Sequence, residues 1–343
     1  MNSNMARNEA IIAVVMPVYK GEKTLAAAIE SVLNQTLRHI ELWVVDDGSP
    51  DKSGRVMDEY ASRDSRVHVI HKSNEGCYHA RLAALKKITT PYFAFVDQDD
   101  IAEPALCEEL LRFALENDLD IAQCDRVGAK SIGRDSEFYS SRDEVVEGYL
   151  WPRLITGGDQ VTVWCKLYKN KFDFSAFEDV ANVTALEDMI YNFQFFSKAE
   201  RLGILHKGLY NYIINDGSSV RNFSLRYLND LREGYRIRQI WLPRYNVASD
   251  VAANLNAAWF IKNARNTLVS ACMSPRVKGE NRANNVNSIL QLEELARAMR
   301  DVSSCNKGLN TSLLFVRLAK SLPTPIFVLI VRMFFGAWRL VRR

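Results

Sequence analysis

The sequence predicts an α/β protein, with a mostly parallel β-sheet covered by helices on both faces and a helical C-terminal region after it. Two observations support this prediction. Between residues 11 and 124, apolar runs of strand length alternate with segments whose apolar residues have helical spacing. From about residue 225 onward the helical spacing continues alone, as at Leu228, Leu231 and Tyr235.

The first strand is the run from Ile11 to Met16, which is apolar throughout, as expected of a strand buried on both faces. Pro17 is expected to end its ladder of hydrogen bonds, and a helix is expected over 22–34. Further strands are expected at 40–45, 67–70, 92–96 and 120–123, and further helices at about 53–62, 78–88 and 104–117. Residues 128–160 look polar and irregular, and helical spacing returns over 183–199.

The composition is that of an ordinary globular protein, with 343 residues, 48% apolar and 25% charged. The length allows one large domain or two moderate ones, and disorder is excluded for the bulk of the chain. A net charge of +3 is too small to predict a nucleic-acid partner. The six cysteines form no C-x-x-C pair, so we expect reduced thiols in a cytoplasmic protein.

Two expected strands end in acidic residues, Asp46–Asp47 and the run Asp97-Gln98-Asp99-Asp100. In a parallel sheet the carboxyl ends of the strands meet at one crevice, so these ends would repel each other unless a cation lay between them. Asp97 and Asp99 supply hard oxygen ligands of the kind that Mg²⁺ or Mn²⁺ binds. The alternative for Asp99 and Asp100 is a cap on the next helix, and we assign that role to Asp100.

Three stretches together resemble a known family: VVMPVYKGEKTLAAAIESVLNQTLRHIELWVVDDGSPDKSG (14–54), NEGCYHAR (74–81) and FVDQDD (95–100). In this order and spacing they resemble the inverting nucleotide-sugar glycosyltransferases of family two, which have the GT-A type fold. The resemblance continues through VWCKLYKN (163–170) and LEDMIYNFQF (186–195) and covers roughly residues 11–220.

The resemblance implies a donor site. Pro17 and Tyr19 would line the nucleotide base, and Asp47 would accept the N3–H of a uracil. Asn74 and Arg81 would lie near the base and the diphosphate. Tyr19 packing under the first helix and Arg81 as a solvated helix residue are the alternatives.

Asp97 and Asp99 match the family's metal-binding D-x-D, and Asp99 is the expected direct ligand of a divalent metal, Mn²⁺ or Mg²⁺. Asp188 matches the general base that must take the proton of the attacking hydroxyl. The alternative for Glu187 and Asp188 is an acidic pair in the first turn of a helix. His206 is a further metal ligand or a structural residue.

The resemblance also implies residues on the acceptor side. Trp164 and Lys166 lie in the stretch that usually shapes this side, with a core role for Trp164 as the alternative. Ser218 and Arg221 fall where relatives place a loop over the diphosphate. Gln98 departs from the Ser of the commoner tetrad, and Lys20 from a frequent Asn. The Q-x-x-R-W signature of processive synthases is absent, so we expect one or a few sugars to be added per acceptor.

We expect an N-terminal tail (1–10), a GT-A catalytic domain (11–222), a helical region (223–312) and an amphipathic basic tail (313–343). The tail contains no apolar run long enough to span a bilayer. It is suited to lie at a membrane interface, and the alternative is that it packs on the protein or in a dimer. The oligomeric state stays open.

The resemblance implies a hexosyl- or N-acetylhexosaminyltransferase that moves a sugar from a nucleotide-sugar donor to a glycan or lipid-linked acceptor. We expect the donor to be a UDP-sugar. The expected setting is cell-surface polysaccharide assembly in the cytoplasm, with peripheral contact at the inner membrane. A nucleotidyltransferase or a dinucleotide-dependent enzyme is disfavoured, because no Gly-rich phosphate loop follows the first strand. The alternative is a non-catalytic binding or scaffold protein, which would be expected to lack the D-x-D or Glu187–Asp188.

Overall fold

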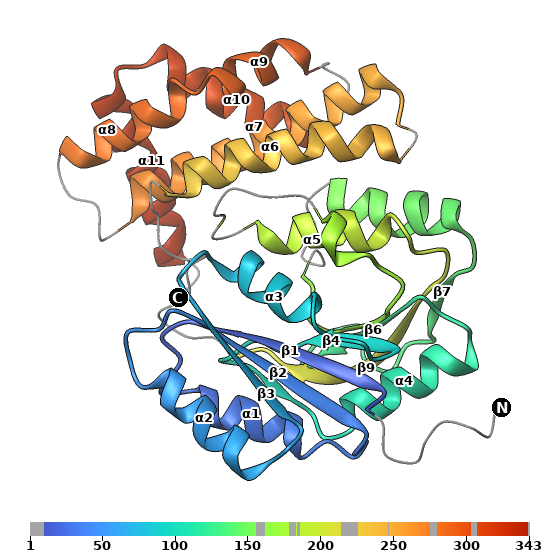
Figure 1. Ribbon diagram of the computed structural model, residues 1–343. Helices are drawn as coiled ribbons and strands as arrows, with labels where there is room; N and C mark the ends of the chain where they lie inside the picture. The colour runs from blue at the N-terminus through green and yellow to red at the C-terminus, as the bar shows by residue number, and fades with distance from the viewer. Residues whose placement is uncertain are drawn as a thin grey trace. The chain divides into compact units, whose positions relative to one another are not determined.

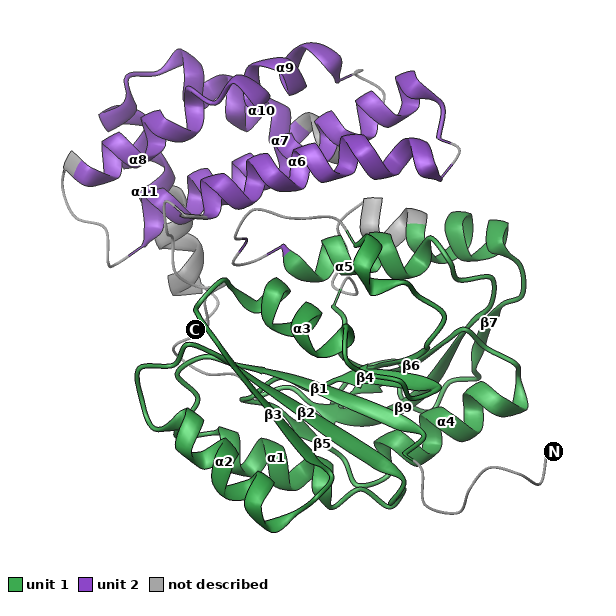
Figure 2. Ribbon diagram, in the orientation of Figure 1, with its two compact units in different colours: residues 1–154, 158–182, 187–215 green, residues 155–157, 183–186, 216–343 purple. Residues whose placement is uncertain are grey.

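The computed structural model describes residues 10–155, 162–177, 183, 186–213, 226–245, 247–274, 280–302 and 307–341. The chain divides into two compact units (Figure 2). Unit 1 comprises residues 1–154, 158–182 and 187–215, and unit 2 comprises 155–157, 183–186 and 216–343. Ser218 and Arg221, expected near the diphosphate, lie outside the described residues.

Unit 1 is built on one sheet. Its described strands are β1 (Ile12–Val18), β2 (Ile40–Asp47), β3 (Val67–Lys72), β4 (Tyr92–Phe95), β5 (Ile101–Ala102), β6 (Ile121–Arg126), β7 (Glu137–Tyr139), β8 (Lys166–Lys169) and β9 (Leu202–Asn211). Their order is β3-β2-β1-β4-β8-β6-β9-β5, and β7 pairs with β9. β1 to β4, β6 and β9 run in one direction, and β5, β7 and β8 run opposite to them. The predicted mostly parallel sheet is confirmed.

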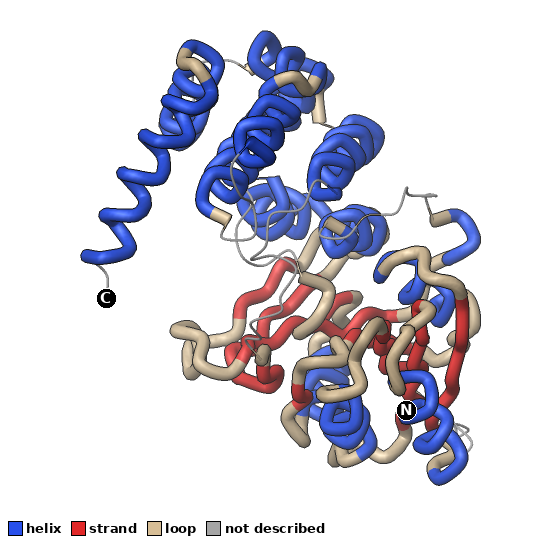
Figure 3. Tube along the Cα trace, turned by 90° about the vertical axis from the view of Figure 1, so that its left-hand side faces the viewer, coloured by secondary structure: helices blue, strands red, loops and turns tan. Residues whose placement is uncertain are grey.

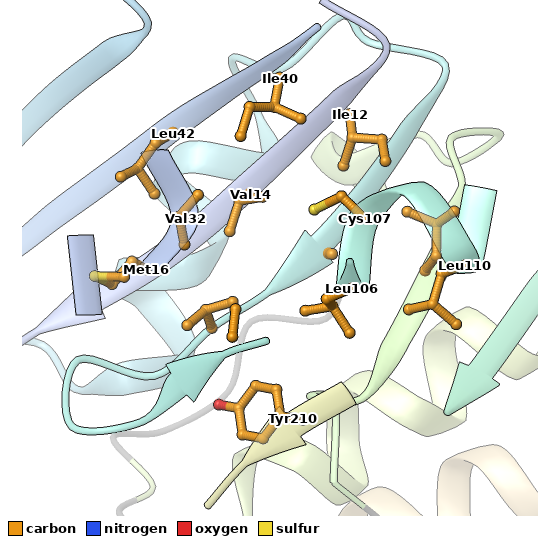
Figure 4. Close-up of a cluster of buried hydrophobic side chains, with 14 of the residues drawn as sticks. Ile12, Val14, Met16, Val32, Ile40, Leu42, Leu106, Cys107, Leu110 and Tyr210 are labelled. Atoms are coloured by element: carbon orange, nitrogen blue, oxygen red, sulfur yellow. The ribbon is translucent and has the colours of Figure 1, made fainter. Parts of the chain in front are cut away.

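Helices cover both faces of this sheet (Figure 1). On one face lie α1 (Leu25–Leu33), α2 (Ser53–Arg63) and α4 (Leu106–Glu116). On the other lie α3 (Cys77–Leu85) and α5 (Glu187–Phe196). The helix α1 forms because its buried residues recur at helical spacing, namely Leu25, Ala28, Ile29 and Val32. They join a core in which β1 and β2 pack against α1 and α4 (Figure 4).

Two local expectations were wrong. Strand β1 runs through Pro17, which pairs in register with Val45 and is followed by Val18 opposite Asp46. A proline lacks only its own N–H, and this one lies near the end of the strand, so the cost to the ladder is small. Residues 128–160 are also more regular than expected, because they contain β7 and a π-helix over Glu144–Ile155. Val145, Tyr149 and Leu150 of that helix are buried, but its Gly148 and Pro152 are poor helix formers, which disfavours a helix from the sequence.

Unit 2 is helical, as predicted for the region after about residue 225 (Figure 3). Its described helices are α6 (Arg226–Arg244), α7 (Ser249–Met273), α8 (Glu280–Leu290), α9 (Glu293–Asp301), α10 (Lys307–Ser321) and α11 (Thr324–Val341). The long helix α7 packs against all the others and buries residues on most of its surface, among them Trp259, Phe260 and Leu268. Among the described residues, no helix combines the length and the apolarity that crossing a membrane requires.

Candidate functional site

The two acidic strand ends are separated by one strand of the sheet. β1 lies between β2 and β4 in the sheet, so the two ends are two strand spacings apart, about 10 Å. Asp46 Oδ1 accepts the backbone N–H of Ser49 at 2.8 Å, and its Oδ2 lies 3.2 Å from His71 Nδ1. The expected repulsion across a shared crevice is therefore relieved within the protein at the end of β2.

Asp47 is almost fully buried, with 3% of its surface exposed. Its Oδ1 accepts hydrogen bonds from Lys72 Nζ (3.0 Å) and the backbone N–H of Glu75 (2.9 Å), and its Oδ2 accepts that of Gly76 (2.8 Å). Gly76 has φ +91°, a conformation that favours glycine, and it immediately precedes α3. Asp47 thus fixes the loop that leads into α3, and among the described residues its Oδ2 accepts this one hydrogen bond, which leaves an acceptor position on Oδ2.

Arg81 lies at the centre of the site, on α3, with 2% of its side chain exposed. Its Nη2 lies 2.8 Å from Asp97 Oδ1, and its Nη1 lies 2.7 Å from Asp188 Oδ1 and 3.8 Å from Glu187 Oε1. The alternative of a solvated helix residue is therefore wrong. One guanidinium faces three carboxylates, so this cluster carries excess negative charge.

Packing between α3 and α5 sets this geometry. The rings of Tyr78 and Tyr191 stack with centroids 4.5 Å apart, and Tyr191 Oη donates to the Tyr78 carbonyl at 2.7 Å. The Arg81 guanidinium lies over the Phe95 ring, 5.5 Å from its centroid. Buried aromatic contacts of this kind hold the helices that carry the charged groups.

Glu187 and Asp188 occupy the first turn of α5, where the free N–H groups of a helix favour negative charge. Asp188 Oδ2 also accepts the backbone N–H of Val163 at 3.3 Å. Burial raises the pKa of Asp188, and Arg81 opposes that rise. Burial and then the charge of Asp188 raise the pKa of Glu187 to about 7. The helix-turn position and a role as base are compatible in this geometry, because burial makes a carboxylate more basic.

The assignment of Asp100 as a helix cap was wrong. Helix α4 follows Ala105 and has no side-chain cap. Asp100 is instead buried, and it accepts hydrogen bonds from Tyr210 Oη (2.8 Å) and the Ile213 N–H (2.9 Å). The same Tyr210 oxygen, in the side chain labelled in Figure 4, accepts the N–H of Asp97 at 3.2 Å. Burial raises the pKa of Asp100 to about 7. The acidic run is thus anchored to β9 through a tyrosine that sequence reasoning missed.

Gln98 joins the ends of β1 and β4. Its Oε1 accepts the N–H of Tyr19, and its Nε2 donates to the Tyr19 carbonyl, both at 2.9 Å. The Tyr19 side chain is 42% exposed, so the alternative in which it packs under α1 is wrong. Lys20 follows with φ +57°, an uncommon conformation for a residue other than glycine. This strained turn presents the Tyr19 ring at the strand end.

The remaining candidates are placed as follows. Asn74 is exposed, and Pro17 is buried in β1. Trp164 is half-buried and stacks on Tyr210 and Tyr212, with centroids 4.9 and 5.6 Å away. Lys166 is buried and donates to the Thr162 carbonyl.

His206 is held between Asp125 Oδ2 (3.0 Å) and Glu137 Oε1 (3.2 Å). It is 8% exposed, so this arrangement is that of a structural residue.

The donor set at the end of β4 suits a hard divalent cation. Among the described residues no group of three or more His, Cys, Asp or Glu side chains could hold a metal ion. Asp97 and Asp99, both half-buried, would supply two carboxylates. Mg²⁺ and similar ions are typically held in this way, by one or two carboxylates plus substrate phosphates.

Comparison with known proteins gives consistent results. The family described as glycosyl transferase family 2 matches residues 13–176. The chain is 27% identical over 307 residues to the uncharacterized glycosyltransferase EpsJ of Bacillus subtilis (strain 168), covering 84% of this chain and 86% of EpsJ. It is 30% identical over 230 residues to the glycosyltransferase GlyA of Streptococcus pneumoniae serotype 4, covering 64% of this chain and 33% of GlyA.

Among solved structures, residues 1–349 of S. aureus TarS in complex with UDP-GlcNAc align with a TM-score of 0.64. That alignment covers 95% of this chain and 92% of the TarS chain at 16% identity, so it shows the shared fold.

Proposed function

Because this chain belongs to glycosyl transferase family 2, through residues 13–176, and is a glycosyltransferase, we propose that it transfers a sugar from a UDP-sugar to a hydroxyl of a glycan or lipid-linked acceptor. One observation carries the proposal: Arg81 contacts both Asp97 of the D-x-D and Asp188, and Asp188 lies 107 residues after Arg81 in the sequence. Groups expected to hold the donor and to activate the acceptor thus lie in one cluster.

In this proposal Asp188 is the general base. Its Oδ1 is held by Arg81 and its Oδ2 by the Val163 N–H, so the carboxylate is fixed in orientation and Oδ2 keeps a lone pair for the acceptor hydroxyl. A sugar hydroxyl is a poor nucleophile at neutral pH, and a positioned base contributes about 10²- to 10⁴-fold to such a step. A single in-line displacement with this base inverts the anomeric configuration.

Asp97 and Asp99 are the proposed ligands of Mn²⁺ or Mg²⁺, and Arg81 orients Asp97. The metal would offset the negative charge that builds on the departing diphosphate. Pro17, Tyr19 and Asn74 are the proposed contacts of the base, and Asp47 holds the loop before α3 and would offer its remaining acceptor position to the uracil. The choice of uridine follows the family resemblance, and it agrees with the UDP-GlcNAc complex of the TarS fragment.

The proposed setting is the cytoplasmic face of a membrane, reached through α10 and α11. Large apolar residues are exposed on these helices, and we call them the tail surface: Leu314, Leu318, Ile326, Leu329, Ile330 and Met333. Phe327 and Val331, on the other side of α11, are buried. Exposed Arg317, Lys320 and Arg332 accompany the tail surface, a combination suited to an anionic lipid interface.

A vesicle assay tests this setting. We expect co-sedimentation with phosphatidylglycerol-containing vesicles but little with pure phosphatidylcholine, and we expect Leu329→Glu/Met333→Glu to abolish it. Val251→Glu changes an exposed apolar residue on α7, outside the tail surface, and should retain binding. Equal binding by both variants would remove the membrane assignment.

A screen of nucleotide sugars tests the enzyme proposal. Melting temperature and release of free nucleotide would be measured for UDP-, GDP- and dTDP-sugars with and without Mn²⁺. We expect one UDP-sugar to raise the melting temperature selectively and to be hydrolysed slowly in the presence of metal. Stabilisation by a GDP-sugar alone would overturn the choice of uridine, and no response to any donor would overturn the proposed reaction.

A further inference from the structure

A cavity of about 340 Å³ opens beside the candidate site, within unit 1. Basic side chains dominate its charged lining, which comprises Asp125, Arg126, Lys130, Arg134 and Lys166, and Trp164 adds an aromatic wall. None of Arg126, Lys130 and Arg134 entered the sequence-based assignments. Their spacing of four residues is the signal that was present in the sequence.

Consecutive turns shape the loop that carries these cations. The N–H groups of Ala129, Ile132 and Arg134 donate to carbonyl groups three residues earlier. Two hydrogen bonds anchor the loop to β9: the N–H of Val127 donates to the Tyr210 carbonyl at 2.8 Å, and that of Gly133 donates to the His206 carbonyl at 3.0 Å. These backbone hydrogen bonds preorganise the loop that carries the three cations before any ligand binds.

The charges in the cavity are unbalanced. Within the part of the chain that the structure describes, Arg126, Lys130 and Arg134 form no ion pair, and all three are exposed. The single carboxylate among the lining residues, Asp125, is already engaged, since its Oδ2 accepts Ser131 Oγ at 2.8 Å and lies 3.0 Å from His206 Nδ1. Three cations with no partner among the described residues, at one cavity, favour a negatively charged ligand.

The strand register places this cavity at the reacting end of the sheet. Ala94 of β4 pairs with Leu167 of β8, which pairs with Ala122 of β6. Asp97 and Asp125 each follow that row by three residues, so they leave the same edge of the sheet about two strand spacings apart, about 10 Å. The segment that precedes β8 links the cavity to the proposed general base. Val163, whose N–H donates to Asp188, lies between the cavity residues Thr162 and Trp164.

We propose that this cavity is the acceptor subsite and that it binds a phosphate or carboxylate group of the acceptor, so that the enzyme glycosylates an anionic glycan. This inference rests on the proposed function. Arginine suits the task, because its planar guanidinium binds either oxyanion through two parallel hydrogen bonds. Trp164 offers an aromatic face to the sugar next to the bound anion, and the adjoining segment positions Asp188 against the hydroxyl that reacts.

Binding of small sugars to the purified chain, without donor, tests the subsite directly. The probes are glucose, glucose 6-phosphate and glucuronate, followed by calorimetry or ligand-observed NMR. We expect both anionic sugars to bind more tightly than glucose, with an affinity that falls as salt is added. Comparing the affinities for glucose 6-phosphate and glucuronate shows whether the subsite prefers phosphate or carboxylate.

The decisive variant is Arg126→Ala/Arg134→Ala, which should weaken binding of the preferred anion by about tenfold or more. Both side chains are exposed, so the melting temperature should stay unchanged. Lys87→Ala removes an exposed cation at the end of α3 and should bind the sugar as the unaltered chain does.

Equal binding by the double variant and the unaltered chain would overturn the anion subsite, as would equal affinity for glucose and the anionic sugars. The two proposals can fail separately. If the double variant loses anion binding but the unaltered chain hydrolyses no nucleotide sugar, the anion site is supported, whereas the proposed reaction and the acceptor role are refuted. Transfer to neutral acceptors with no preference for anionic ones would refute the acceptor role alone.

Discussion

The two acidic strand ends of unit 1 look alike in sequence and differ in the structure. At the end of β2, Asp47 has Lys72 and two backbone N–H groups as donors, and Asp46 has Ser49 and His71. At the end of β4, Asp97 shares the single guanidinium of Arg81 with two further carboxylates. Hydrogen-bond donors and cations of the protein itself therefore compensate the charge of Asp46 and Asp47, and Asp47 stabilises the loop before α3. The second cluster has more negative charge than its cation can offset, and this excess distinguishes the chemical site from the structural one.

Replacing the proposed base should have the largest effect. Asp188→Asn keeps the size of the side chain but cannot take a proton, and its one amide oxygen replaces two oxygens that accept from Arg81 and from the Val163 N–H. We expect kcat for sugar transfer to fall by about 10³-fold, with a loss of stability smaller than that of Arg81→Met. The matched control is Asp118→Asn, an exposed carboxylate with φ +49°, a conformation that asparagine tolerates, and it should transfer normally. Undiminished transfer by Asp188→Asn would refute the assignment.

Arg81→Met removes the only cation that contacts the three carboxylates in the described structure. Taking one partner from a buried ion pair typically costs about 3–5 kcal/mol, because the charge that remains is uncompensated. We expect a loss of that size in the free energy of unfolding by urea, measured at neutral pH. Arg55→Met on α2 removes an arginine whose side chain is 70% exposed, and it should change stability by well under about 1 kcal/mol. Similar losses in the two variants would contradict the central place of Arg81.

Asp47→Asn and Asp99→Asn compare the two strand ends directly. Asp47→Asn weakens charge-assisted hydrogen bonds that hold the loop before α3, so we expect about 1–3 kcal/mol less stability. Asp99→Asn should cost less stability than Asp47→Asn, because Asp99 is half-buried and Asp47 is almost fully buried, and it should remove the response of transfer to Mn²⁺. Urea unfolding and metal titration of the activity separate the two. The comparison breaks if Asp99→Asn unfolds the chain more readily than Asp47→Asn.

Asp100 gives the smallest effect, a dependence of stability on pH. Burial raises its folded pKa to about 7, above the value of an unfolded aspartate, so its protonated form favours the folded state. Its contribution to stability is full below about pH 4 and is lost as the pH rises through about 7. In metal-free buffer, Asp100→Asn should therefore flatten the fall in stability between these values.

Asp64→Asn is the control of opposite sign. The hydrogen bond from Arg66 lowers the pKa of the Asp64 carboxyl, so the unaltered side chain contributes stability that is lost as the pH falls. An unchanged slope between pH 4 and 7 in Asp100→Asn would contradict the buried position of Asp100.

Much of unit 1 could be predicted because its strands are buried on both faces and therefore read as unbroken apolar runs, as in β1 and β4. The π-helix over Glu144–Ile155 could not, because Gly148 and Pro152 within it are poor helix formers. In the site, Asp97, Asp99 and Asp188 follow from the pattern and the resemblance. The burial of Arg81 does not, since its partner Asp188 lies 107 residues away, and neither does the bond from Tyr210 to Asp100, which spans 110 residues. The sequence shows which charged side chains are present, and tertiary contacts decide which of them are paired with an opposite charge or a hydrogen-bond donor.

Gln98 has a consequence for the evolution and redesign of this enzyme. Its side chain acts toward Tyr19 as a neighbouring strand would, donating to one backbone group and accepting from the other. It needs room to do so, because a Cβ at Gly21 would clash with Gln98 Oε1. Positions 21 and 98 are therefore coupled: a larger residue at 21 would displace the end of the Gln98 side chain and break its hydrogen bonds to Tyr19, whereas a serine at 98, as in the commoner tetrad, would remove that conflict. A donor loop transplanted from a relative would have to bring both positions with it.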